Sequence, residues 1–159
     1  MAQRAASRRL DEGRTPVWWY LVVSGAYLVA SAITGFVYTA SFGVGPQASR
    51  VGAETIFGVF ETNGWHNLAG LINGVAALGF AMTPTRIARA GSIFIGVASG
   101  LVAILLFVWP DQPLLASNGA DQVVHVSVAV GGIVAGLATR TEPAPGGATP
   151  PREASTARG

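Results

Sequence analysis

Four long apolar runs dominate the pattern of hydrophobic and polar positions along the chain. Each is edged by an aromatic residue or a charge, and they cover about 17–40, 65–82, 91–109 and 120–139, the last being the weakest. A helix needs about 20 mostly apolar residues to cross a bilayer, and its backbone groups must pair within the segment. The pattern therefore predicts an all-α fold, a four-helix transmembrane bundle over residues 17–139.

Composition supports a membrane environment. Hydrophobic residues make up 50% of the chain and charged residues 11%, whereas a soluble domain carries about 25% charged residues. The chain has no cysteine, which excludes disulfides, thiolate nucleophiles and cysteine-ligated metal clusters. The basic residues are scattered and no nucleic-acid motif accompanies them. We therefore expect the lipid bilayer, other membrane proteins or a second copy as partners, and no nucleic acid.

The distribution of arginine predicts the topology. Nine of the ten Arg lie before the first run, between the second and third, or after the fourth, and only Arg50 lies elsewhere. Such a bias marks the cytoplasmic side, so we expect a multi-pass protein of the cytoplasmic (inner) membrane with both termini in the cytoplasm. A signal peptide cleaved near Ala32 is the rival interpretation, but the apolar run continues to about Ala40, beyond a signal sequence's apolar stretch of about 7–15 residues.

The segments outside the apolar runs are polar. Residues 1–16 form a basic tail, and 140–159 are rich in Pro, Gly and Ala, which predicts a disordered tail. In the loop at 41–62, an apolar stretch around Phe57 and Phe60 favours either a short helix on the membrane surface or a plain lead-in to the second run.

Two segments repeat a pattern. Thr62–Gly70 and Ser117–His125 both read hydroxyl, Asn-Gly, any residue, polar, amide and aliphatic, and both open an apolar run. The repeat favours two tandem helical hairpins, with coincidence as the alternative.

Small residues four positions apart mark helix contacts, because helices in lipid associate through close packing and polar contacts. We expect the small faces of the second and fourth runs to meet. We also expect the amide of Asn73 to pair with Ser99 or with a polar stripe on the first run, with a substrate contact as the less favoured alternative. The small pairs are Ser31/Gly35, Gly70/Gly74, Gly96/Gly100 and Gly132/Gly136, and the stripe is Ser24, Tyr27, Ser31, Thr34 and Tyr38.

The only plausible chemistry lies where the second and fourth runs begin. His66, Asp121 and His125 should converge there, and two imidazoles with a carboxylate fit a metal site or a proton-handling pair. The competing interpretation is structural: Asn63 and Asn118 are natural N-caps, and Asp121 fits a capping box. We favour capping and packing, and so predict no catalytic residue, no metal and no cofactor. The full polar cluster is Asn63, His66, Asn67, Asn73, Asn118, Asp121 and His125.

The segments Phe57–Leu68 and Ser117–His125 resemble an actinobacterial family of small four-helix integral membrane proteins catalogued only as a domain of unknown function. The likeness covers about 17–139 and implies fold and location, without an activity. Members usually carry a further His one turn after the His-Asn pair, where this chain has Gly70. That departure weakens the case for a metal or haem.

We therefore predict a non-enzymatic membrane protein with a structural, accessory or partner-binding role. The alternative is a protein that handles a small molecule, an ion or protons through His66, Asp121 and His125.

Overall fold

Four helices make up most of this computed structural model, which describes residues 15–44 and 52–141. The predicted tails and Arg50 lie outside the described residues, apart from the first tail's last two residues, Thr15 and Pro16, and the second's first two, Arg140 and Thr141. The all-α class is confirmed, with one small sheet. The elements are α2 (Pro16–Tyr38), β1 (Glu54–Ile56), β2 (Phe60–Thr62), α3 (Gly64–Ala81), α4 (Thr85–Val108) and α5 (Gly119–Ala138).

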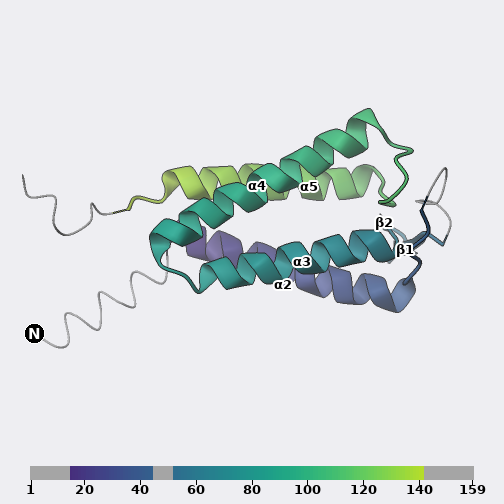
Figure 1. Ribbon diagram of the computed structural model, residues 1–159, viewed down its shortest axis with the longest axis horizontal. Helices are drawn as coiled ribbons and strands as arrows, with labels where there is room; N and C mark the ends of the chain where they lie inside the picture. Colours follow the sequence, from purple (N-terminus) through teal and green to yellow (C-terminus); the bar gives the residue numbers. More distant parts are fainter. Residues whose placement is uncertain (1–14, 45–51, 142–159) are drawn as a thin grey trace, which may run out of the picture.

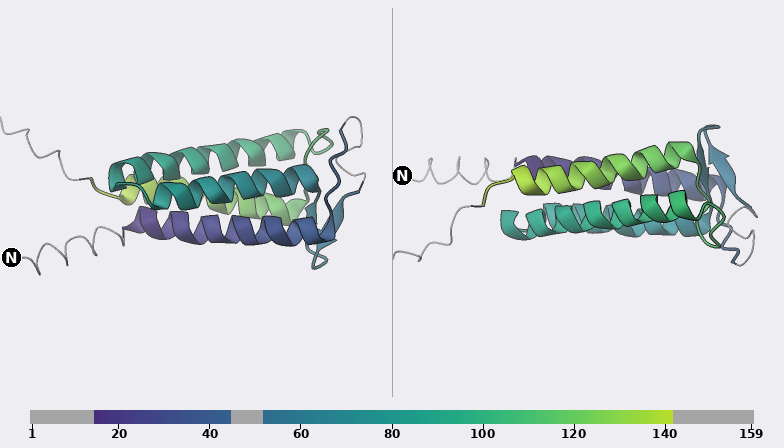
Figure 2. Two further views of the ribbon diagram at one scale, coloured as in Figure 1. Left: turned by 60° about the horizontal axis from the view of Figure 1, so that its bottom comes forward. Right: turned by 90° about the horizontal axis from the view of Figure 1, so that it is seen from above.

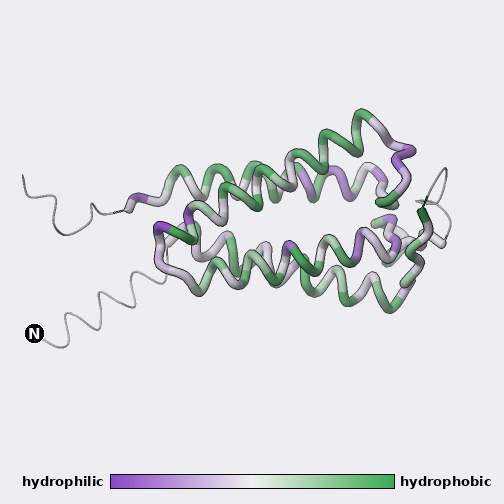
Figure 3. Tube along the Cα trace, viewed as in Figure 1, coloured by the Kyte–Doolittle hydropathy of each residue, from purple (hydrophilic) through white to green (hydrophobic). Residues whose placement is uncertain are grey.

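The helices run side by side along one elongated body (Figures 1 and 2). The start of α2, the α3–α4 turn and the end of α5 lie at one end, which we call the tail end. The β1–β2 sheet and the α4–α5 loop lie at the other, the hairpin end. Hydrophobic positions follow the helices, and hydrophilic positions gather mainly towards the two ends (Figure 3).

The most extensive packing joins α2 to α3 and α4 to α5, so the chain folds as two helical hairpins in tandem. Glycines bring the backbones together within each pair. A Cβ added to Gly74 would lie 2.9 Å from the carbonyl oxygen of Gly25, and one added to Gly96 would lie 2.8 Å from that of Ala129. Side chains larger than hydrogen would push these helices apart.

The expected meeting of small faces from the second and fourth runs is wrong. A Cβ on Gly70 would face Ala32 of α2 at 3.7 Å, and one on Gly136 would meet Ile93 of α4 at 2.5 Å. Each small face is therefore used within its own helical hairpin.

Two hydrogen bonds join the helical hairpins, one from α2 to the C-cap of α5 at the tail end and one from α2 to the middle of α5. The backbone N–H of Val17 donates to the Thr139 hydroxyl at 3.2 Å, and the Tyr20 hydroxyl donates to the Val128 carbonyl at 2.8 Å. Val17 and Leu21 are fully buried beside these bonds.

Helix α4 starts at Thr85, earlier than the apolar run at 91, so Arg86 and Arg89 belong to its first turns rather than to a loop. Arg89 Nε donates to the carbonyl of Gly136 at 2.7 Å. An apolar run underestimates a helix whose first turns carry charges.

Three helices among the described residues, α2, α4 and α5, are long and apolar enough to cross a membrane. The sequence pattern singled out the last run as the weakest, but α5 qualifies and α3 does not. The reason is the composition of α3, because its 18 residues include His66, Asn67 and Asn73.

The loop at 41–62 contains a β-hairpin, so neither the predicted surface helix nor the plain lead-in is right. Strands β1 and β2 pair antiparallel with Ile56 opposite Phe60. Phe57 and Gly58 turn the chain with φ of 52° and 71°, and the N–H of Val59 donates to the Ile56 carbonyl at 3.0 Å. Two consecutive positive φ values fit the tight turn that closes a hairpin, and they exclude a helix.

Candidate functional site

Two asparagines cap the helices that begin at the hairpin end. Asn63 Oδ1 accepts from the backbone N–H of His66 at 2.9 Å. Asn118 Oδ1 accepts from the N–H groups of Ala120 and Asp121 at 3.0 and 3.3 Å. Each side chain satisfies N–H groups that the first helical turn leaves without partners. The N-caps predicted from the repeated Asn-Gly are therefore present.

The same asparagines also cross from one helical hairpin to the other. Asn63 Nδ2 donates to the carbonyl of Leu114, and Asn118 Nδ2 donates to that of Val59, both at 2.8 Å. Leu114 precedes Asn118 by four residues, as Val59 precedes Asn63. The repeated segments thus hold each other through equivalent bonds, an arrangement that we call the asparagine clasp.

The residues three positions after the asparagines extend this symmetry with opposite polarity. His66 Nδ1 lies 2.6 Å from the Ala116 carbonyl oxygen, which only accepts, so Nδ1 carries the hydrogen. Asp121 Oδ2 instead accepts from the N–H of Glu61 at 3.2 Å and of Asn118 at 3.0 Å. The capping box predicted around Asp121 is present.

The rings of His66 and His125 stack between α3 and α5. Their centroids lie 5.7 Å apart, with 21° between the ring planes. Since α3 and α5 do not pack extensively, the stacked rings are a direct bridge between these helices. The expected proximity of the histidines is found, although the glycine faces invoked to explain it point elsewhere.

Asn67 ties the end of α2 to the start of α3. Its Oδ1 accepts from the Thr62 hydroxyl, and its Nδ2 donates to the Thr39 carbonyl at 3.1 Å. The amide occupies space that Gly35 leaves open, because a Cβ there would lie 2.0 Å from Asn67 Oδ1.

No group of three or more His, Cys, Asp or Glu side chains within 15–44 and 52–141 is placed to hold a metal ion. Asp121 Oδ2 already accepts two backbone bonds, whereas the bond from His66 Nδ1 to a backbone carbonyl leaves Nε2 of that ring available. The metal alternative stays a hypothesis.

The polar side chains at the hairpin end form a layer, which we call the polar layer: Asn63, His66, Asn67, Asn118, Asp121 and His125. A cavity of about 350 Å³ extends from this layer towards the middle of the body. His66, Asp121 and His125 line it near the hairpin end. Asn73 of α3 lies two turns beyond His66, so it lines the cavity about 10 Å further along the axis, and Ser99 of α4 also contributes to the lining.

The polar side chains in the deeper part of the cavity do not pair with one another. The expected bond from Asn73 to Ser99 or to the stripe on α2 is absent from the described residues, although Ser31 and Thr34 line the same cavity. Trp65 Nε1 is the only buried side-chain nitrogen or oxygen in the described chain that lacks a partner. The polar atoms of Asn73 and Ser99 are therefore accessible from the cavity itself.

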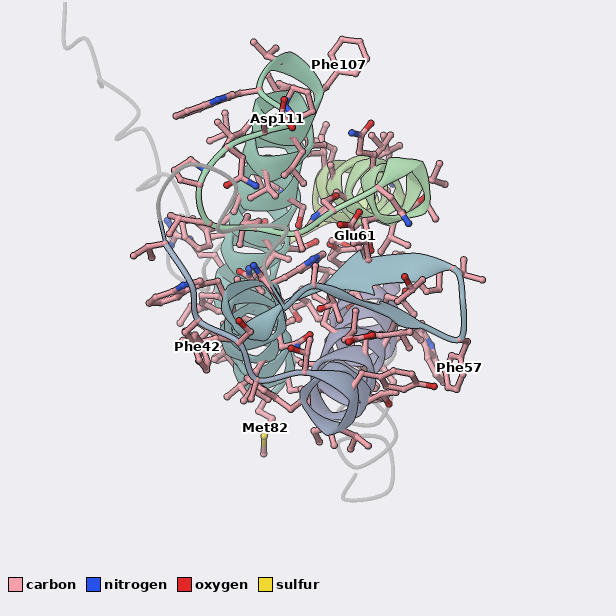
Figure 4. The ribbon with its side chains drawn as sticks, turned by 90° about the vertical axis from the view of Figure 1, so that its right-hand side faces the viewer. Phe42, Phe57, Glu61, Met82, Phe107 and Asp111 are labelled. Carbon is pink, nitrogen blue, oxygen red and sulfur yellow. The ribbon has the colours of Figure 1, made fainter. Side chains whose placement is uncertain are left out.

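The β-hairpin borders the cavity at the hairpin end, where Ile56, Phe57 and Phe60 contribute to its lining. Figure 4 views the molecule from this end. The sheet lies across α2 and reaches α5, Glu61 lies on the side facing α5, and Phe57 lies at the turn. The Phe57 ring meets Tyr38 edge-on at a centroid distance of 6.0 Å.

The polar layer is predictable from the sequence pattern, whereas the cavity was not predicted. The sequence did carry a signal for the cavity. The stripe on α2 and the side chain of Asn73 are polar groups that are unfavourable in contact with lipid. They were expected to satisfy each other, whereas they surround an open volume.

One family, described as a domain of unknown function (DUF4383), matches residues 19–138. No curated protein and no solved structure matches the chain. The match assigns no activity to the clasp or the cavity, so a function has to be argued from their chemistry.

Proposed function

Since the chain belongs to the DUF4383 family, whose description assigns no activity, we propose from its own geometry a non-enzymatic multi-pass membrane protein that holds a small molecule in its interhelical cavity. The carrying observation is that Asn73 and Ser99 present unpaired polar atoms to an open volume of about 350 Å³. Binding pockets for small molecules begin at about 300 Å³ and are mostly apolar with a few polar groups.

Four membrane crossings are part of this proposal, with α3 as the fourth. Ile72 and Val75 on α3 are 60% and 57% exposed, so an apolar face points outwards, whereas Asn73 lines the cavity. A helix can cross a bilayer with polar side chains when these face the protein interior. The arginine bias supports a cytoplasmic tail end in the inner membrane, and Arg86 and Arg89 lie at that end.

Unpaired polar atoms at this depth favour an occupant. Water is scarce in the bilayer core, and an amide or hydroxyl without a hydrogen bond costs several kcal/mol there. A small molecule with a polar group lowers that cost when it bonds to Asn73 or Ser99. The polar layer serves a different purpose, because the bonds of Asp121 and His66 to backbone groups hold the site together. This use of those residues supports a non-enzymatic role.

Purification from the native membrane followed by native mass spectrometry tests the proposal. Val124 lines the cavity, and its neighbour Val123 is 66% exposed. Wild type should release a bound small molecule on activation in the gas phase. Val124→Phe should remove most of that species because the larger ring fills the cavity, and Val123→Phe should retain it.

Thermal unfolding of both variants in detergent confirms that they fold. If wild type carries no small molecule, or if both variants retain it equally, the cavity is not the binding site and the proposal fails.

A further inference from the structure

The ligand class can be argued from the size, charge and hydrogen-bonding groups of the cavity, an argument that rests on the proposed function. An engineered apolar cavity of about 150 Å³ accommodates benzene, which has six carbon atoms. In proportion, the volume of about 350 Å³ here accommodates roughly 14 non-hydrogen atoms. That size fits a bicyclic ring system or a short amphiphile, and is far too small for a two-chain lipid.

The lining does not favour a charged ligand. It contains no Lys or Arg, so an anion would enter without a counter-charge. Its one acidic side chain, Asp121, already accepts two backbone hydrogen bonds through Oδ2. An ion leaving water for this site would lose more hydration than the lining replaces.

The hydrogen-bonding groups lie at defined depths. At the hairpin end, His66 and Asn67 are engaged with backbone and side-chain partners. Asn73 lies about 10 Å deeper. Its amide and the hydroxyls of Ser31 and Ser99 line the cavity with no hydrogen bond among the described residues. Apolar groups such as Leu28 and Val102 contribute to the same lining.

We propose that the cavity takes an uncharged, mainly apolar molecule of roughly 14 non-hydrogen atoms, whose oxygen is hydrogen-bonded at the depth of Asn73. A ketone or an alcohol meets this description. The Asn73 amide both donates and accepts, so it serves either group.

Three naphthalenes of nearly equal size separate the possibilities. Methyl 2-naphthyl ketone carries an acceptor, 2-ethylnaphthalene carries none, and 2-naphthoate carries a charge. Each is titrated by equilibrium dialysis against the purified full chain in detergent. Val124→Phe at the same detergent concentration serves as the reference, so that partition of the probe into micelles cancels.

We expect the ketone to bind wild type about five- to tenfold more tightly than 2-ethylnaphthalene, as one hydrogen bond implies, and the naphthoate to bind more weakly than both. Asn73→Leu should remove the preference for the ketone while 2-ethylnaphthalene still binds. Ile72→Leu, a neighbouring change on the exposed face, should preserve the preference.

The contrary outcomes are distinct. Equal or tighter binding of 2-ethylnaphthalene, or a preference that survives Asn73→Leu, overturns the hydrogen-bonding assignment while the cavity remains a binding site. Tightest binding of the naphthoate overturns the uncharged class. If no probe binds above the Val124→Phe reference, the assigned size and chemistry are wrong. Native mass spectrometry of the protein purified from its own membrane shows separately whether the cavity holds a small molecule, and so whether the proposed function also fails.

Discussion

Asn63 and Asn118 are reciprocal partners, since each caps its own helix and donates to the carbonyl four residues before the other. Each side chain thereby performs two tasks, because it caps the start of a helix and joins the two helical hairpins. The clasp fixes the starts of α3 and α5 relative to each other, and so sets where the histidine rings meet.

The two tasks of Asn118 can be separated by substitution. Asn118→Ser keeps a good N-cap but loses the bond to Val59, whereas Asn118→Ala loses both. We expect a loss of about 1 kcal/mol in unfolding free energy for serine and about 2 kcal/mol for alanine, measured by denaturant unfolding in detergent micelles. No loss for serine would show that the bond to Val59 contributes nothing, and equal losses for the two variants would show that the cap contributes nothing.

Gly35 should not tolerate a methyl group. In Gly35→Ala the Cβ would lie 2.0 Å from Asn67 Oδ1, so the amide must move and its bond to Thr39 weakens. We expect a loss of about 1–3 kcal/mol in unfolding free energy. Gly79→Ala is the matched control, because nothing lies within 4 Å of its added Cβ, and it should be neutral or stabilising. Equal effects at both sites would contradict this packing.

The turn of the β-hairpin contains a removable strain. Phe57 has a φ of 52°, a conformation that asparagine adopts more readily, and Gly58 follows it. In Phe57→Asn, the relaxed turn should raise the unfolding free energy by about 0.5–1 kcal/mol, and loss of the ring contact with Tyr38 should lower it. Tyr38→Ala/Phe57→Asn, compared with Tyr38→Ala, isolates the gain from the turn. No gain in that pair would show that the conformation costs nothing.

Topology can be read from reporter fusions at five positions. Fusions at residues 5, 88 and 150 should report the cytoplasm, and fusions near residues 50 and 114 the outside, as the arginine bias predicts. Residue 88 decides the matter for α3, because it follows the one helix that lacks the apolar character of the others. An outside signal there would mean that α3 does not cross.

Local patterns predicted local structure well. The repeated Asn-Gly predicted both N-caps, because capping depends on residues a few positions apart. The same repeat predicted the two helical hairpins. The cavity escaped prediction because it depends on how four helices are rotated about their axes, which no single segment encodes. The prediction that the glycine faces of the second and fourth runs meet was wrong for the same reason. The spacing shows that Gly70 and Gly74 share a face, but it does not show which helix that face contacts.

The turn between β1 and β2 could not be predicted from its residues either. Phenylalanine rarely adopts a positive φ, so Phe57 indicates an apolar surface more strongly than it indicates a turn. Pairing of Ile56 with Phe60 is what holds it there. In that segment, contacts between strands outweighed the preference of the individual residue.

The opposite hydrogen-bond polarity at His66 and Asp121 makes the two halves of the chain complementary instead of interchangeable. Two first halves brought together from separate chains would offer two imidazole donors and lack the carboxylate that receives the N–H of Glu61. Two second halves would offer two carboxylates and lack the ring that reaches the Ala116 carbonyl. The duplication seen in the sequence is therefore asymmetric in its hydrogen bonds, because one repeat donates through an imidazole and the other accepts through a carboxylate.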